Sequence, residues 1–136
     1  MTKSNSDIWV TTTKFWHMEK QSKTTKGINK VCKHNIRAIH DTLDVIGGKW
    51  KISIISCLSF YPMRYSELLR EVEGISGKML SRELKELEMN QLITREVLST
   101  QPITVQYQLT EYGETLKPLT LTIADWGLNH RKQIIG

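Results

Sequence analysis

The sequence predicts a mainly α-helical fold with one small β-hairpin, an α+β arrangement in a single domain. From about residue 35 onward, apolar residues recur at spacings of three and four, which is the period of an amphipathic helix. Two β-prone runs, 92–98 and 103–109, interrupt this pattern. A length of 136 residues suits one domain with a modest core.

Two helices are expected in the first half of this region. The first runs from about Asn35 until Gly47-Gly48 ends it, and the second covers about 49–60, before Pro62. The apolar positions of the first helix are Ile36, Ile39, Leu43 and Ile46. Those expected to enter the core from the second are Trp50, Ile54, Ile55 and Leu58.

A tight pair of helices is expected next. Residues 65–72 predict a short helix with Ser66 near its start, and Gly74 follows its end. Its inward residues are expected to be Leu68, Leu69 and Val72. A helix over about 76–90 then begins at Ser76, a good N-cap. Two helices joined by a short glycine-containing turn form a helix-turn-helix arrangement.

The 76–90 helix has two faces with different chemistry. Leu80, Leu84 and Leu87 form a buried stripe, while basic residues repeat the same spacing about half a turn away: Lys78, Arg82 and Lys85. The small or slender residues Gly77, Met79 and Ser81 would let the basic face approach a partner closely. A helix that lies in a DNA major groove needs these properties. Taken alone, the same pattern also fits an ordinary solvated surface helix.

A β-hairpin is expected directly after this helix. Its second run alternates apolar and polar residues, and Ser99-Thr100-Gln101-Pro102 separates the two runs. A two-stranded ribbon in this place is the wing of a winged helix. Its tip would lie beside the sugar-phosphate backbone, and the absence of Lys and Arg from the tip predicts a weak salt dependence of the wing contact.

The last expected helix covers about 111–133, with Thr110 as its cap and Pro118 as a kink or short break. One apolar stripe runs along it: Leu116, Leu119, Ile123 and Trp126. A small helical core has little room for another long apolar helix. The stripe is therefore expected to pack against a partner subunit, or alternatively against the first helix of the same chain.

Charge and composition restrict the function classes. Residues 1–36 hold seven lysines against Asp7 and Glu19, whereas residues 37–136 hold twelve basic and twelve acidic residues. Residues 1–30, rich in Thr, Ser and Lys, predict a flexible basic arm ahead of a 31–136 domain. Met18 offers an alternative start for the product. DNA binding by the domain must rest on where its charges lie, not on net charge.

No membrane or secretory segment is expected. The apolar run 52–58 is too short to span a bilayer, and the N-terminus lacks the apolar core of a signal peptide. Two cysteines without paired spacing, Cys32 and Cys57, predict a reducing cytoplasm and no disulfide framework.

Enzymatic and metal-binding functions are not indicated. Gly47-Gly48-Lys49 lacks the spacing of a phosphate-binding loop, and its glycines are explained by the end of a helix. The histidines are scattered, so no metal site or cofactor is expected. No nucleophile has an identifiable base partner.

Four segments in register resemble the HxlR-type winged helix-turn-helix regulators over about residues 32–130. They are Asp44-Val45-Ile46-Gly47-Gly48-Lys49-Trp50-Lys51, then Arg64-Tyr65-Ser66-Glu67-Leu68, then the start and end of the 74–88 segment, and finally Tyr107–Gly113 with Trp126-Gly127. The resemblance implies a cytoplasmic bacterial transcription factor that binds a partly palindromic operator as a homodimer. It also implies that the 76–90 helix is the recognition helix and that the terminal helices form the dimer interface.

The expected DNA contacts follow from these two lines of reasoning. Lys78, Ser81, Arg82 and Lys85 are expected to face the major groove, with Arg82 and Lys78 reading guanine edges. Ser76 and the free backbone amides of Gly77 and Lys78 at the helix start suit a phosphate, and the slender Met79 beside them is included among the expected DNA contacts. Residues of the preceding helix and of the wing tip are expected to contact the DNA sugar-phosphate backbone and so to position the protein on DNA: Arg64, Tyr65, Ser66, Thr100, Gln101 and Thr104. The alternative is a winged-helix module that contacts other proteins without specific DNA binding.

Cys32 is a candidate redox sensor, because many members of the family sense oxidants through a cysteine just before the first helix. It lies several residues earlier than the usual family cysteine, and Lys33, not proline, follows it. Nearby Lys30, Lys33 and His34 would favour a thiolate. An unreactive exposed cysteine is the alternative. Cys57 is expected to be a small buried apolar residue.

Overall fold

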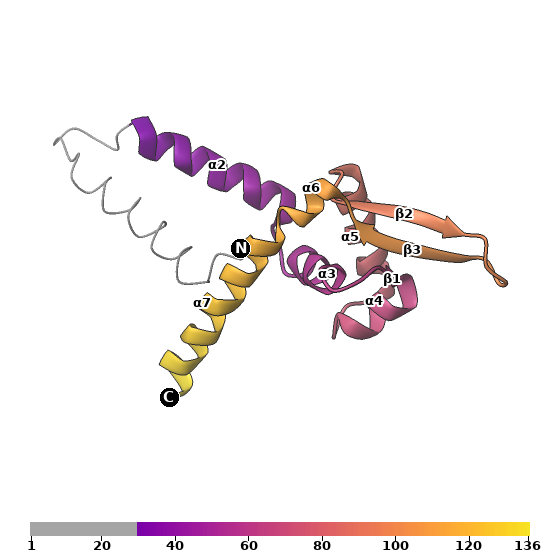
Figure 1. Ribbon diagram of the computed structural model, residues 1–136. Coiled ribbons are helices and arrows are strands. Elements are labelled where there is room, and N and C mark those ends of the chain that lie inside the picture. Colours follow the sequence, from indigo (N-terminus) through magenta and orange to yellow (C-terminus); the bar gives the residue numbers. More distant parts are fainter. Residues whose placement is uncertain (1–29) are drawn as a thin grey trace, which may run out of the picture. The chain divides into compact units, whose positions relative to one another are not determined.

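A computed structural model of the chain describes residues 30–136 (Figure 1). The predicted arm over residues 1–30 therefore lies outside the described residues except for its last position. The chain divides into two units, Met1–His40 and Asp41–Gly136. Within residues 30–136, no helix combines the length and the apolar character needed to cross a membrane.

Helix α2 spans Lys30–Ile46 and α3 spans Trp50–Leu58. Helix α2 begins five residues earlier than expected, because its first turn carries few apolar residues and so gives no periodic signal. The predicted stop at Gly47-Gly48 is confirmed, and Gly48 has a φ of +87°, a conformation that glycine adopts without steric cost. Ile54, Ile55 and Leu58 of α3 are buried as predicted, whereas Trp50 is only half-buried.

The helix-turn-helix consists of α4, Tyr65–Glu71, and α5, Gly77–Met89. The Arg64 amide donates to Glu67 Oε2 at 2.8 Å, which satisfies a free donor at the start of α4. The predicted N-cap of α5 is confirmed, because the Ser76 hydroxyl accepts a hydrogen bond from the Met79 amide at 3.1 Å. The inward placement of Leu69 was wrong, since Leu69 is exposed while Leu68 and Val72 are buried. A helix of only two turns buries a narrow stripe, and Leu69 lies outside it.

The end of α5 is a Schellman motif, in which the amides of Gln91 and Leu92 donate to the carbonyls of Glu88 and Leu87, each at 3.0 Å. Gln91 has a φ of +60°, a left-handed conformation that glycine usually occupies in this motif. The turn directs the chain from α5 straight into the hairpin.

The hairpin belongs to a three-stranded antiparallel sheet of order β1-β3-β2 (Figure 1). Strands β2, Ile93–Leu98, and β3, Thr104–Leu109, are the two predicted runs, and Arg95 lies opposite Tyr107. The additional strand β1, Met63–Arg64, was not expected, because two residues after a proline carry no alternation that could be recognised. Burial along the hairpin ends near its base: Tyr107 is buried, but Ile103 and Val97 near the tip are exposed.

The expected last helix is divided in two, α6 over Glu111–Glu114 and α7 over Lys117–Ile135. The short break that Pro118 predicted is confirmed, with the proline in the first turn of α7, where a missing N–H costs no helical hydrogen bond. Thr110 caps α6 as predicted, accepting from the Gly113 amide at 2.9 Å, and its hydroxyl donates to the Gln91 carbonyl at 2.6 Å.

The core lies between α3, α4, α5 and the base of the sheet. Its most completely buried side chains come from each of these elements: Ile54, Ile55, Leu68, Leu80, Leu84, Leu87, Leu92 and Ile93. The buried stripe predicted for the 76–90 helix is thereby confirmed. Because three leucines fix its inner side, α5 can present its other side to solvent.

Candidate nucleic-acid interface

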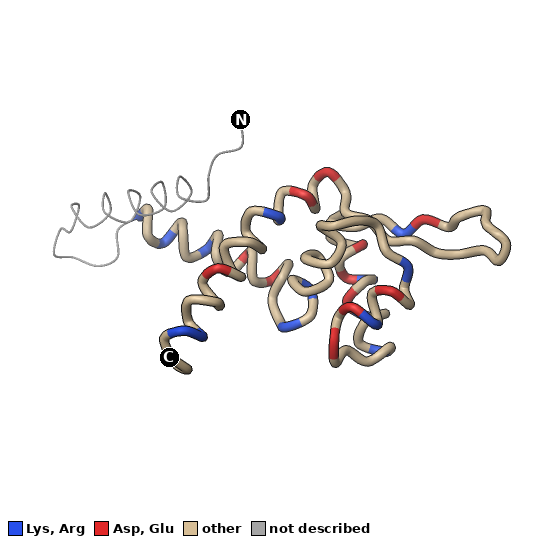
Figure 2. The backbone as a smooth tube through the Cα atoms, turned by 60° about the horizontal axis from the view of Figure 1, so that its bottom comes forward, with Lys and Arg blue, Asp and Glu red and all other residues tan. Residues whose placement is uncertain are grey.

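The exposed side of α5 carries the residues predicted to face DNA. Lys78, Ser81, Arg82 and Lys85 are all exposed, and we refer to these four as the outward face of α5. Lys78 and Lys85 form no salt bridge within the part of the chain that the structure describes. The helix also holds three glutamates, and Figure 2 shows both signs of charge along this part of the backbone. Over the whole of α5 the three glutamates balance the three basic residues, so the excess of positive charge is confined to the outward face.

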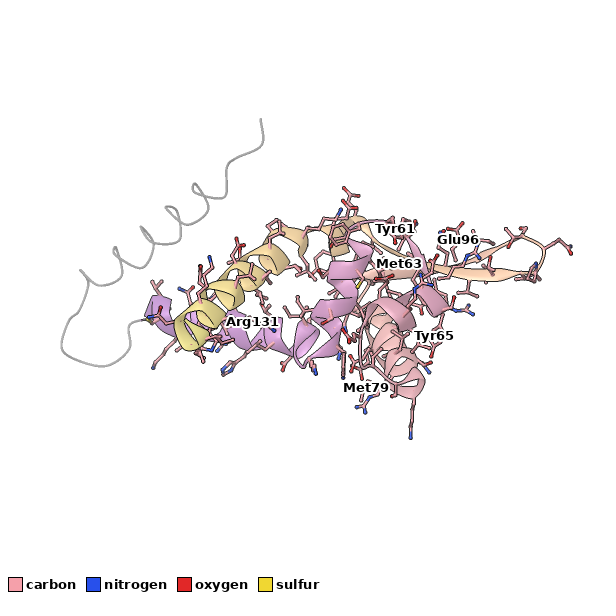
Figure 3. All side chains as sticks on the ribbon, turned by 90° about the horizontal axis from the view of Figure 1, so that it is seen from below. Tyr61, Met63, Tyr65, Met79, Glu96 and Arg131 are labelled. Carbon is pink, nitrogen blue, oxygen red and sulfur yellow. The ribbon has the colours of Figure 1, made fainter. Side chains whose placement is uncertain are left out.

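Tyr65 connects the two helices of the helix-turn-helix. Its hydroxyl donates to the Gly77 carbonyl at 2.7 Å and accepts from the Ser81 hydroxyl at 3.2 Å. Tyr65, labelled in Figure 3, is half-buried at the start of α4, so one side chain fixes the first turns of α5. A Cβ atom at Gly77 would lie 3.1 Å from the Tyr65 hydroxyl, which is a tight contact. The arrangement requires a small residue at Gly77.

Lys51 of α3 forms ion pairs with two glutamates of α5. Its ammonium lies 2.6 Å from Glu83 Oε2 and 2.6 Å from Glu86 Oε2, and the Lys51 side chain is only 11% exposed. Glu83 Oε2 is buried and receives no well-directed hydrogen bond from the described residues, so the ammonium is what compensates its charge. This three-residue cluster was not predicted from the sequence.

Both charged states in this cluster are favoured by their neighbours. Burial by itself lowers the pKa of Lys51, but hydrogen bonds and charges from Glu83 and Glu86 outweigh it, and the pKa is raised. The hydrogen bond and charge of Lys51 lower the pKa of Glu86, and Arg82 adds to this effect. At neutral pH the lysine is therefore an ammonium and Glu86 a carboxylate.

Arg82 is not a free cation. Its Nε lies 3.5 Å from Glu86 Oε1, while the other oxygen of the same carboxylate faces Lys51. The Arg82 side chain is 71% exposed, and the contact with Glu86 is made by Nε, not by the terminal nitrogens of the guanidinium.

The other predicted contacts lie around α5 and at the wing, by which we mean β2, β3 and the residues between them. Arg64 and Ser66 are exposed at the start of α4, and Met79 is half-buried against the core. At the wing tip, the Thr100 hydroxyl is 2.8 Å from the Pro102 carbonyl and 2.7 Å from the Thr104 hydroxyl. The exposed Gln101 lies between these residues. These bonds give the uncharged tip a defined shape.

Helix α7 carries the predicted dimer stripe. Leu116 and Leu119 are half-buried and pack against the core, whereas Ile123 is 45% exposed and Trp126 is 61% exposed. The Trp126 ring stacks on His130 with centroids 4.9 Å apart. No residue of α7 is buried in the described chain, and four more large apolar side chains are exposed on it: Leu121, Leu128, Ile134 and Ile135.

Neither cysteine forms a disulfide. Cys32 lies in the first turn of α2 and is half-buried, so it is inside the helix and not ahead of it. Cys57 is half-buried against the core, and burial raises the pKa of its thiol, as expected of an unreactive cysteine. Residues 30–136 contain no group of three His, Cys, Asp or Glu side chains arranged to hold a metal ion.

Sequence reasoning did not connect Lys51, Glu83 and Glu86, which the structure joins in one ion-pair cluster. The only local sign was that Glu83 and Glu86 are three apart on a helix, next to the buried stripe, where an uncompensated charge would be costly. The partner is on another helix, far away in the sequence.

A three-helix core with a helix-turn-helix, basic residues on the exposed side of its second helix and a β-hairpin wing defines the winged helix-turn-helix class of DNA-binding regulators. Residues 45–134 match the HxlR-like helix-turn-helix family, and the chain belongs to this family. The resemblance inferred from the four sequence segments is thus confirmed, and so is the class of protein: a DNA-binding transcriptional regulator and not an enzyme.

Known proteins of this class are similar over most of their length. The HTH-type transcriptional regulator YtcD of Bacillus subtilis (strain 168) is 41% identical over 104 residues, which cover 76% of this chain and 82% of YtcD. The redox regulator HypR in its oxidized form is 39% identical with a TM-score of 0.65, over 68% of this chain and 95% of that one. The reduced form of the transcriptional regulator YodB from B. subtilis is 35% identical with a TM-score of 0.60, over 65% and 87% of the two chains.

Proposed function

We propose that this regulator binds a partly palindromic operator as a homodimer, with α5 of each subunit in the major groove. The single observation that carries this proposal is the outward face of α5. Its exposed Lys78, Arg82 and Lys85 stand opposite a stripe of buried leucines. A helix fixed on one side and cationic on the other suits recognition in the major groove.

The roles within the interface follow from geometry and charge. Lys78 and Lys85 are unpaired within the described chain and attract phosphates, while the terminal nitrogens of Arg82 make base contacts. The amides at the start of α5 and the hydroxyl groups of the wing tip position the DNA backbone. Because the tip is uncharged, most of the salt dependence comes from α5 and from any contribution of the lysine-rich residues before α2.

The dimer is proposed to form through α7. Its exposed apolar residues, Ile123 and Trp126 among them, would be covered by the second subunit. Two recognition helices related by a twofold axis would then read two half-sites.

The test is fluorescence anisotropy with DNA from upstream of the protein's own gene and with a scrambled duplex, each at two salt concentrations. Binding of one site at least ~1,000-fold more tightly than the scrambled duplex is expected for an operator-reading regulator. Equal and steeply salt-dependent binding to both would contradict the proposal and favour a protein-interaction module.

A pair of double variants separates recognition from general charge. Arg82→Ala with Lys85→Ala should abolish selective binding and leave the dimer intact, as measured by analytical ultracentrifugation. The matched control, Lys49→Ala with Arg70→Ala, removes the same charge from exposed positions outside α5, the wing and α7. Selective binding that survives the first change, or that is lost equally in both, would refute the assignment of α5.

The dimer interface is tested independently with Trp126→Ala. Because Trp126 is 61% exposed, its removal should leave the fold of the subunit intact while weakening dimer formation. Sedimentation at a series of concentrations measures this, and an unchanged dimer would exclude Trp126 from the interface.

The role of Cys32 as a redox sensor stays a prediction. HypR, a protein of similar fold, is described as a redox regulator. A mild thiol oxidant should change DNA binding of the unaltered protein, and Cys32→Ser should remove that response. An unchanged response in the variant would exclude Cys32 as the sensor.

A further inference from the structure

The side of α5 that faces the protein is connected to its outward face through one carboxylate. Glu86 uses Oε2 to bind the Lys51 ammonium at 2.6 Å and Oε1 to approach Arg82 Nε at 3.5 Å. Exposure increases along this series, from 11% for the Lys51 side chain through 40% for Glu86 to 71% for Arg82. The three side chains therefore lead from the interior of the domain to the surface proposed to meet DNA.

The contact between Arg82 and Glu86 leaves the terminal guanidinium nitrogens of Arg82 available to bind a base. An arginine has five N–H donors in a rigid plane, and bidentate contact with a guanine edge uses a pair of them. Glu86 approaches Nε, so the nitrogens at the end of the guanidinium remain for the partner. A contact that engages one edge of the plane also restricts its rotation. Restricting a side chain before binding lowers the entropy cost of the complex and favours one orientation.

Lys51 restricts Glu86 in the same manner. Without the ammonium, Glu86 would be free to rotate and to bind Arg82 through both oxygens, which would engage the nitrogens that read DNA. Lys51 also compensates negative charge on a helix whose three basic and three acidic residues otherwise cancel. Both effects act on Arg82 or on the field around it, although Lys51 itself is too buried to reach DNA.

We propose that Lys51 and Glu86 are positioning residues for base selection by Arg82: the ammonium fixes the carboxylate, and the carboxylate fixes the guanidinium. This rests on the proposed function, namely that Arg82 reads a base. A purely structural role for the cluster would weaken binding to every sequence alike. A positioning role changes the preference among sequences and disappears when Arg82 is absent.

The experiment uses the full chain and duplexes selected by it from a random DNA library, together with single-base variants of the preferred duplex. Arg82→Ala is measured first and should lower discrimination at one base pair of each half-site. If Arg82→Ala changes discrimination nowhere, the recognition role in the proposed function fails, and the positioning proposal fails with it.

Lys51→Met and Lys51→Arg are then compared at that base pair. Lys51→Met should lower discrimination about threefold or more, whereas Lys51→Arg, which keeps the positive charge, should restore most of it. In the Arg82→Ala background, Lys51→Met should have no further effect on discrimination. An equal loss in both backgrounds, or a uniform loss of affinity for all duplexes, would overturn the proposal while leaving the proposed function standing.

Glu86→Gln provides an independent measurement, because it keeps Lys51 paired with Glu83 and so preserves the connection between α3 and α5. Circular dichroism confirms the fold of each variant before binding is measured. Glu86→Gln should lower discrimination at the same base pair as Lys51→Met. If a folded Glu86→Gln protein discriminates between the bases as well as the unaltered protein does, the positioning role is refuted. This test holds even when Lys51→Met does not fold.

Discussion

Replacing Tyr65 with phenylalanine tests whether one phenol fixes the start of the recognition helix. The change removes only the oxygen that donates to the Gly77 carbonyl at 2.7 Å and accepts from Ser81 at 3.2 Å. A hydrogen bond contributes about 0.5–1.5 kcal/mol net, and water can reach exposed Ser81 and replace one of the two. We therefore expect a loss of about 1 kcal/mol in the free energy of unfolding, which lowers the Tm of a domain of this size by about 4–8 °C.

Thermal unfolding followed by circular dichroism measures this loss, and Tyr61→Phe is the matched control. Tyr61 is exposed and its hydroxyl has no hydrogen-bond partner among the described residues, so that variant should keep the Tm of the unaltered protein. Equal Tm values for Tyr65→Phe and Tyr61→Phe would refute the reasoning. If Tyr65 instead acts only as a contact to the DNA backbone, Tyr65→Phe should weaken DNA binding without lowering the Tm.

Three further predictions concern the turn after α5, the junction with α6 and the Lys51 cluster. Gln91→Gly should raise the free energy of unfolding by up to about 1 kcal/mol, because a non-glycine residue at a φ of +60° is strained; urea titration would contradict this by showing no gain. Gly113→Ala should lower the free energy of unfolding by about 1–3 kcal/mol, since the added Cβ would collide with the Leu92 carbonyl oxygen, and an unchanged urea midpoint would disprove the clash. The stabilisation that Lys51 and Glu86 give each other should be complete between their ordinary pKa values of 4.5 and 10.5, since the pKa of Glu86 is lowered and that of Lys51 raised. The difference in unfolding free energy between the unaltered protein and Lys51→Met should shrink as the pH falls below this window or rises above it, and a difference independent of pH would refute the ion pairs.

The sequence could predict which side chains of a helix are buried where apolar residues repeat at helical spacing. Leu80, Leu84 and Leu87 repeat at helical spacing, and all three are buried because a helix packed on one side must bury such a stripe. The caps at Ser76 and Thr110 were also predictable, because a short polar side chain before an apolar run satisfies free amides.

Contacts between distant segments could not be predicted in this way. The strand at Met63 exists only because Tyr107 lies opposite it, and no local pattern marks a strand of two residues. The ion pairs of Lys51 likewise join α3 to α5 across the core, and only the fold brings them together. At the candidate site the sequence indicated which residues are exposed on α5, but not that Arg82 shares a carboxylate with a buried lysine.

With dimerisation through α7, as proposed above, the uncovered apolar residues of that helix would make the amount of protein in the cell a variable of regulation. In a dimeric regulator, both the fraction of subunits in dimers and the fraction of operator bound rise with protein concentration. Operator occupancy therefore increases more steeply than the number of chains does. A cell that halves its supply would lose more than half of its bound operators in the dilute range. Side chains far from the DNA, such as Trp126, would then determine the copy number at which the gene responds.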